Sequence, residues 1–264
     1  MIVLLLATAM ASPCDDTDAG LAVGPSTVNP RPGDLGSGHR ICPRTEVGGH
    51  ISGGAVIDTA DFYGHLVGGL SAEGSLALDD RTEIFGQLEL VRYDALISAF
   101  SDSALGLGHT TLGISRRVAE GESWGIATHG RLVLPTAVSL YRNAWPFALD
   151  AGATVEMRAG PLRPHATVMG LFSMAASAGP KYPWLGLGWV AGSELRAGQT
   201  FGFLLDLSGT WGYGADGLDH ISLDPGFRFG FSQVVGAELG LHVTLAGRDW
   251  APLGLKLRMT GRWP

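Results

Sequence analysis

Charged side chains are scarce in this chain. Asp, Glu, Lys and Arg make up 16% of its 264 residues, below the ~25% that is usual in soluble domains. Disorder is still excluded for most of the chain, because 45% of the residues are hydrophobic. The formal net charge of -7 offers no basic surface for nucleic acid, which we therefore exclude as a partner.

Long apolar runs are also missing. The longest, at the start, spans roughly a dozen residues, whereas a membrane-spanning helix needs about 20. This run fits the apolar part of a signal peptide over 1–11, with Ala9-Met10-Ala11 as cleavage site, although no Lys or Arg precedes it. Residues 12–44 are rich in Pro, Gly, Ser and Asp and lack periodicity, so we expect a disordered periplasmic leader there.

Cysteine is nearly absent. The chain has 2 cysteines, Cys14 and Cys42, and both fall in the expected leader. In an oxidising compartment a disulfide between them is plausible. Two idle thiols, or a lipid on Cys14, are the alternatives that the sequence leaves open.

Catalytic motifs are missing as well. The sequence has no His-Glu-x-x-His zinc motif and no P-loop. The stretch "GWVAGSE" (188–194) is not the Gly-x-Ser-x-Gly nucleophile elbow. The best hydrolase candidates are His109 with Ser101 and Asp102, and the pair Asp219-His220. Catalysis needs a nucleophile held beside a base, and an isolated loop histidine is usually an ordinary polar residue. We expect no enzyme, no cofactor and no metal.

What the chain does have, after residue 44, is a repeated period of two. In "VGAELGLHVTLAG" (235–247) apolar residues alternate with Gly, Glu, His and Thr, which indicates a β-strand. About twelve such segments follow one another, most of them long enough for a tilted membrane strand of ~9–11 residues. They lie near 45–58, 62–78, 82–95, 108–119, 123–135, 147–159, 162–175, 183–196, 200–213, 218–231, 234–246 and 252–263.

The connections between these segments alternate in length. Short ones fall at 79–81, 120–122, 160–161, 198–200 and 232–233, and longer ones at 96–107, 136–146, 176–182, 214–217 and 247–251. Short turns alternating with longer loops are typical of outer-membrane barrels. We therefore predict an all-β, transmembrane, antiparallel up-and-down β-barrel of about 12 strands over 45–264. A soluble sandwich or lipocalin-like barrel is the alternative, but the apolar residues of so many long strands would overfill one core.

Polar residues on the second face of these strands should line the lumen. The candidates are Glu89, His129, Arg131, Asp150, Glu156, Arg158, Arg163, His165, Asp206, Asp224, Arg228, Glu238, His242, Lys256, Arg258 and Arg262. Both signs of charge are present, so the set could form cross-strand ion pairs or line a polar path for a solute.

Adjacent strands suggest specific partners for these residues. Glu156 and Arg158 should face Arg163 and His165, and Arg228, Glu238 and His242 should neighbour Lys256 and Arg258. If the last strand closes on the first, the row Lys256, Arg258 and Arg262 should meet Glu46, His50 and Asp58.

The stretch "LGLGHTTLGISRRVAEGESWGIATHGRLVLPTA" (105–137) resembles the meta-pathway phenol-degradation-like family of outer-membrane proteins. Members tend to show G-L-G-D-x-x-L-G-x-K/Y-R, a short turn, and a strand ending in L-P-T-G. The matching positions are Gly106-Leu107-Gly108, Leu112-Gly113, Arg116 and Leu134-Pro135-Thr136, whereas His109 and Ala137 depart from the pattern. The resemblance implies a porin-like barrel that transports hydrophobic or aromatic compounds.

These observations together predict a channel or transporter for a small solute in the outer membrane of a Gram-negative cell. Its expected partners are the lipid bilayer, lipopolysaccharide, the barrel-assembly machinery and the solute itself. A non-conducting structural or adhesion barrel, whose outer loops bind a partner, is the alternative.

Overall fold

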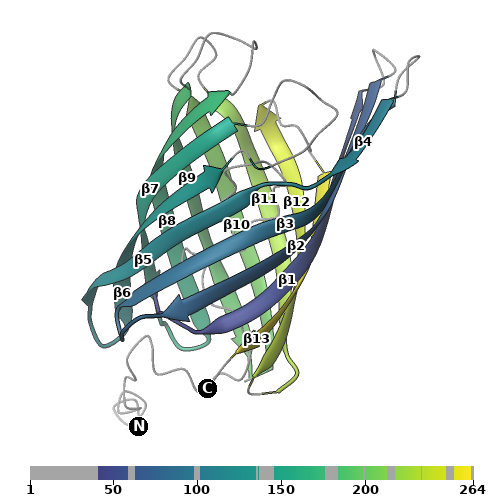
Figure 1. The fold of residues 1–264 in the computed structure, drawn as a ribbon. Helices are drawn as coiled ribbons and strands as arrows, with labels where there is room; N and C mark the ends of the chain where they lie inside the picture. Colours follow the sequence, from purple (N-terminus) through teal and green to yellow (C-terminus); the bar gives the residue numbers. More distant parts are fainter. Residues whose placement is uncertain are drawn as a thin grey trace.

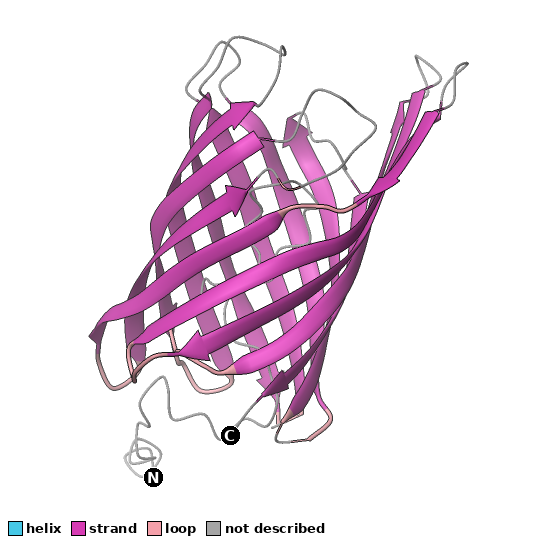
Figure 2. Cartoon of the chain, viewed as in Figure 1, coloured by secondary structure: helices cyan, strands magenta, loops and turns pink. Residues whose placement is uncertain are grey.

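The computed structural model describes residues 41–58, 63–97, 102–134, 136, 146–175, 184–198, 200–212, 218–232, 234–247 and 253–262. These residues form β-strands joined by turns, drawn in magenta and pink in Figure 2. The strands are β1 (Glu46–Asp58), β2 (Tyr63–Ala77), β3 (Thr82–Ile97), β4 (Asp102–Gly106), β5 (Thr110–Glu120), β6 (Trp124–Leu134), β7 (Pro146–Met157), β8 (Leu162–Ala175), β9 (Trp184–Ala197), β10 (Phe201–Gly212), β11 (Leu218–Gly230), β12 (Val235–Gly247) and β13 (Leu253–Arg262). Within these ranges no helix is long and apolar enough to cross a membrane.

The strands close into one antiparallel barrel (Figure 1). β1 pairs with β2 on one side and with β13 on the other, so that Ala55 lies opposite both Leu66 and Leu253. Strands β4 and β5 both pair with β3 and therefore share one place in the wall. The described strands thus occupy 12 places, which confirms the predicted fold class.

At this shared place in the wall the prediction from the sequence was wrong. The segment 96–107 was predicted to be a loop, but β3 runs on to Ile97 and β4 pairs with it. Between β4 and β5 the chain bends at Gly108, whose N–H donates to the Glu89 carbonyl at 2.9 Å. A Cβ on Gly108 would lie 1.8 Å from the Glu89 carboxylate. A side chain at position 108 would require the Glu89 side chain to move. The bend divides one long strand into two.

The two faces of the wall have opposite chemical character. Leu241 points outward and is 45% exposed, whereas the next residue, His242, points inward and is 1% exposed. Along β10 the same alternation leaves Leu205 and Leu207 exposed and buries Asp206 and Ser208. Apolar residues outside and charged residues inside are the pattern of a membrane barrel. A lipocalin-like barrel would show the reverse, so the soluble alternative is excluded.

At one end of the barrel short turns join adjacent strands. At the turn after β2, the Asp79 carboxylate accepts hydrogen bonds from the N–H groups of Arg81 and Thr82 at 2.7 and 2.6 Å. Two other turns use Gly160 and Gly198 with φ of 64° and 76°, a conformation that favours glycine. β1 begins and β13 ends at this same end, at the bottom of Figure 1. The longer connections at the other end lie mostly outside the described residues.

A ring inside the barrel covers one glycine of the wall. Phe85 of β3 lies opposite Gly113 of β5 and is only 6% exposed. A Cβ on Gly113 would approach the Phe85 ring to 2.2 Å. The aromatic side chain therefore occupies the space that a side chain at Gly113 would need.

We predict that Gly113→Val lowers the free energy of unfolding by about 1–3 kcal/mol, because it overpacks this contact. Urea unfolding of the refolded protein in lipid vesicles, followed by tryptophan fluorescence, measures the change. Gly130→Val on β6 is the control, since a Cβ there would meet only the Asp150 carbonyl oxygen at 3.9 Å. Equal losses in the two variants would contradict the packing described.

Candidate functional site: the lumen

The structure places the predicted lumen residues on the inward-facing side of the wall. Buried side chains are His129, Arg131, Asp150, Glu156, Arg163, His165, Asp206, Asp224, Arg228, Glu238, His242 and Lys256. Glu89, Arg158 and Arg258 are partly buried, and the side chain of Arg262 lies outside the described residues. The lumen is therefore polar, while the use of these residues by a solute stays a prediction.

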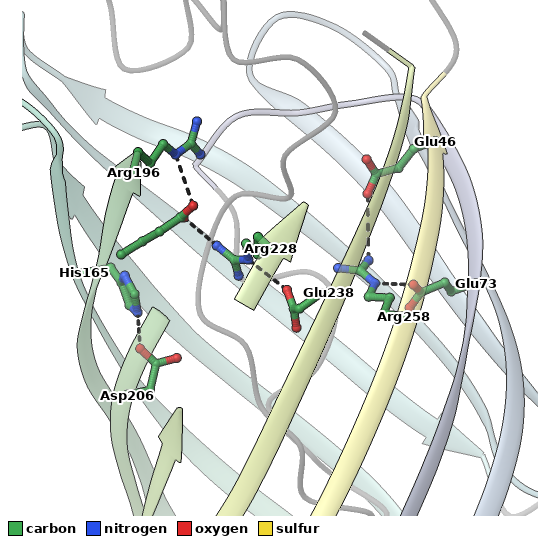
Figure 3. Close-up of polar contacts among 9 residues, drawn as sticks. Glu46, Glu73, His165, Arg196, Asp206, Arg228, Glu238 and Arg258 are labelled. Atoms are coloured by element: carbon green, nitrogen blue, oxygen red, sulfur yellow. Dashed lines mark hydrogen bonds and ion pairs between the residues drawn. The ribbon is translucent and has the colours of Figure 1, made fainter. Parts of the chain in front are cut away.

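Arg228 is the centre of one ion-pair network (Figure 3). Its guanidinium donates from Nη1 to Glu194 Oε2 at 2.7 Å and from Nε to Glu238 Oε2 at 2.8 Å. Glu194 also accepts from Arg196 Nε at 3.1 Å. These four side chains are at most 4% exposed. The network joins β9, β11 and β12. Of the predicted neighbours, Glu238 and Arg258 are opposite residues of β12 and β13.

A second network lies at the closing seam (Figure 3). Arg258 of β13 donates to Glu73 of β2 and lies 3.8 Å from Glu46 of β1. His50 Nδ1 is 3.7 Å from the other oxygen of Glu73. As predicted, Arg258 faces His50 across the seam. The predicted meeting of Asp58 with this row does not occur, because the pairing of β1 with β13 ends at Ala55.

Glycines allow two side-chain contacts in the lumen to cross an intervening strand. His165 of β8, Gly192 of β9 and Asp206 of β10 lie in one register row. A Cβ on Gly192 would stand 1.9 Å from the Asp206 carboxylate. A Cβ on Gly202 of β10 would similarly stand 2.3 Å from the Glu194 carboxylate, which crosses that strand toward Arg228. Contacts that pass over these glycines thus connect strands that are not neighbours.

Two His–Asp pairs lie in the same row. His165 Nε2 is 2.7 Å from Asp206 Oδ1, and His242 Nδ1 is 2.5 Å from Asp224 Oδ1. The two carboxylates belong to residues directly opposite each other on β10 and β11. Ser208 donates to the second oxygen of Asp224 at 2.6 Å. The predicted neighbourhood of Glu156 and His165 is also present, since they are opposite residues of β7 and β8.

An apolar patch interrupts the polar lining. Met169 of β8 and Val190 of β9 pack together at 1% exposure, with Leu171 against them. On the neighbouring strands Val133 and Ala148 are also buried and lie opposite each other. The sequence offered one signal for this patch, because Met169 and Val190 occupy inward positions that are polar further along the same strands.

The residues just before β1 turn into the barrel rather than away from it. Ile41 and Cys42, 1% and 5% exposed, pack against the inward-facing Ala127 of β6. The N–H of Arg44 donates to Glu83 of β3 at 2.7 Å. We call residues 41–45 the strap, since it crosses from β1 to β6 near the end of the barrel that carries the short turns. The rest of the leader and the signal peptide over 1–11 lie outside the described residues and stay predictions.

Cys42 is disulfide-bonded. Its predicted partner, Cys14, lies outside the described residues, so the pairing itself stays a prediction. The only two cysteines of the sequence are these two.

The hydrolase candidates gain no support from their surroundings. The ring Nδ1 of His109 lies 3.3 Å from the Leu134 carbonyl oxygen. The backbone N–H of His109 donates to the Glu89 carboxylate at 3.1 Å. Ser101 lies outside the described residues, as do the side chains of Asp102, Asp219 and His220. Among the described residues no group of three or more His, Cys, Asp or Glu could hold a metal ion.

Comparison with known proteins identifies the fold. No family model and no curated protein matches the chain. An outer membrane channel from Pseudomonas putida F1 superposes with a TM-score of 0.65 at 13% identity, over 87% of this chain and 99% of its own. The KdgM porin, solved with disordered oligogalacturonate, gives 0.52 at 6% identity over 83% and 99%. The β domain of the Bordetella autotransporter Brka gives 0.55 at 15% identity over 84% and 100%.

At these identities the likeness shows the fold alone. The fold is that of outer-membrane channels, and these neighbours are a channel, a porin and an autotransporter barrel rather than enzymes. Membership of the meta-pathway phenol-degradation-like family stays a prediction.

We predict that Arg228→Met lowers the free energy of unfolding by about 3–5 kcal/mol, because it removes the buried cation that Glu194 and Glu238 share. Arg81→Met removes an exposed pair, Arg81 Nη2 to Glu120 at 3.5 Å, and should cost at most about 1 kcal/mol. Denaturant unfolding in vesicles compares the two. Adding Glu194→Gln and Glu238→Gln to Arg228→Met should restore much of the loss, and no recovery would contradict the network.

Proposed function

We propose that the chain is an outer-membrane channel through which a small solute passes without energy input. The observation that carries the proposal is the closed wall with an apolar outside and an ion-paired, charged inside. Such a wall suits a bilayer on one face and a polar solute path on the other. The channel and porin among the structural neighbours support it. In this proposal the barrel contacts lipid and lipopolysaccharide, and the barrel-assembly machinery inserts it.

We propose further that the solute is amphipathic, with an apolar or aromatic body and a polar group. The apolar patch of Met169, Val190 and Leu171 lies on β8 and β9. The seam network around Arg258 lies on β13, β1 and β2, on the opposite side of the barrel in strand order. A solute between these walls would meet apolar surface on one side and charge on the other. The resemblance to a family of aromatic-compound transporters points to the same class.

One observation favours the second candidate, a non-conducting barrel. The strap places Ile41 and Cys42 inside the lumen, where they narrow the periplasmic mouth. A barrel sealed there would act through its outer loops, which lie mostly outside the described residues. Conductance decides between the two candidates.

We predict steady single-channel conductance for the purified full chain in planar bilayers. Cys42→Ser, or a reducing agent, should raise that conductance, because the strap loses a covalent constraint. The matched control is the reducing agent applied to Cys42→Ser, which should change nothing further. A silent barrel in both redox states would favour the non-conducting candidate.

We predict that Leu241→Arg, at the middle of β12, destabilises the barrel in vesicles by about 2–4 kcal/mol, the cost of a cation at the bilayer midplane. Ala197→Arg is the control, since Ala197 is the exposed last residue of β9 beside a turn and its cost should fall to about 0–1 kcal/mol near the interface. Equal effects at the two depths would argue against a membrane location.

A further inference from the structure

The strongest unexplained feature of the lumen is the row that contains two facing carboxylates. Asp206 and Asp224 lie directly opposite each other on β10 and β11 and are 0% and 1% exposed. Like charges directly opposite each other in a sheet are destabilising. A wall built only for stability would avoid this pair.

Each carboxylate is held from its far side by a histidine. His165 reaches Asp206 at 2.7 Å across Gly192, and His242 reaches Asp224 at 2.5 Å (Figure 3 shows the first pair). The order around the wall is therefore His, Asp, Asp, His. An imidazole, with an ordinary pKa of about 6.5, changes its charge in the physiological range. With both imidazoles protonated and both carboxylates ionised these four side chains have no net charge, and with both imidazoles neutral they carry two negative charges.

The surroundings of His165 contain charges of both signs. Glu156 on β7 lies opposite it, Arg163 precedes it on β8, and Glu194 on β9 lies opposite Arg163. Arg228 on β11 already binds Glu194 and Glu238. The two guanidiniums keep their charge at all physiological pH values, so they do not add to the change in charge at this position.

The surroundings of His242 are balanced in a similar way. On its own strand lie Thr244, 3.4 Å from Nε2, and Glu238, which binds Arg228. On β13 the residue opposite His242 is Gly254. Further along β13 on the lumen side come Lys256 and Arg258, and Arg258 binds Glu73. The cations near His242 keep their charge at all physiological pH values, so they do not add to its titration.

We propose that His165, Asp206, Asp224 and His242 form the pH-dependent selectivity element of the lumen. At acidic pH the neutral row admits cations and anions alike. At alkaline pH its two uncompensated carboxylates favour cationic solutes, such as those with an ammonium group, and disfavour carboxylate-bearing ones. The field of the carboxylates acts through the lumen, so direct contact with the solute is not required. This inference rests on the proposed channel function.

The test is the reversal potential of the full chain in planar bilayers under a KCl gradient, at about pH 5 and about pH 8, either side of the ordinary imidazole pKa. We expect the K⁺/Cl⁻ permeability ratio to rise roughly 35-fold at the higher pH, because two unit charges acting over about 8 Å of water favour K⁺ and disfavour Cl⁻ by about sixfold each. His165→Gln with His242→Gln should keep cation preference at both pH values, because glutamine never carries charge. Asp206→Asn with Asp224→Asn should abolish the rise.

The matched control is His129→Gln, an inward-facing histidine of β6 in another row, opposite Gly152. It should keep the wild-type pH dependence, and a loss of the rise there would overturn the assignment. A conducting wild-type barrel whose selectivity ignores pH would also overturn it.

A second readout separates this inference from the channel proposal. Heat unfolding in detergent, read by gel mobility, should fall in midpoint from about pH 5 to about pH 8 for the wild type, since the charged pairs exist only while the imidazoles are protonated. The double glutamine variant should show a smaller fall. If the barrel does not conduct, the proposed function and the selectivity role both fail. If it conducts but the melting curves of wild type and variant shift alike, only the inference fails.

Discussion

The hydrogen-bonded seam between β1 and β13 is the constraint on which the rest of the structure depends. In hydrocarbon no water can satisfy an open strand edge, so a membrane sheet must close on itself. Closure fixes which alternate residues face inward, because side chains along a strand point to opposite faces. The charged residues of every strand then face one enclosed space. The ion pairs of Arg258 with Glu73 and Glu46 lie at the seam itself and join β13 to both β2 and β1.

The abundance of glycine, 40 residues, acquires a structural meaning in this enclosed space. Because Gly192 and Gly202 have no side chain, the carboxylates of Asp206 and Glu194 can pass over them and bind partners on the strand beyond. Charge pairing in this lumen is therefore not limited to adjacent strands. The longer reach lets a narrow barrel compensate many charges while it keeps an apolar patch around Met169 on one side.

Much of the fold could be predicted from the sequence, because a period of two reports a strand with two unlike faces. β7 was predicted over 147–159 and runs from Pro146 to Met157. β4 was missed because its five residues are too few to show a period, and because the bend at Gly108 breaks the strand. Partners on neighbouring strands, such as Glu156 and His165, follow from a short turn. The contact between His165 and Asp206 spans 41 residues and depends on the register of two successive strand pairs, which periodicity does not give.

The contacts of the strap were not predicted either, since five residues without periodicity offer no pattern to read. Its position has a consequence for the order in which the protein matures. Cys42 is 5% exposed and packs inside the finished barrel, where a folded oxidant could not reach its sulfur. We therefore expect a protein oxidant to form its disulfide on the open chain, before the last strand pairs with the first. The strap would then already be tethered when the wall closes around it, so that oxidation and insertion are successive steps of one assembly.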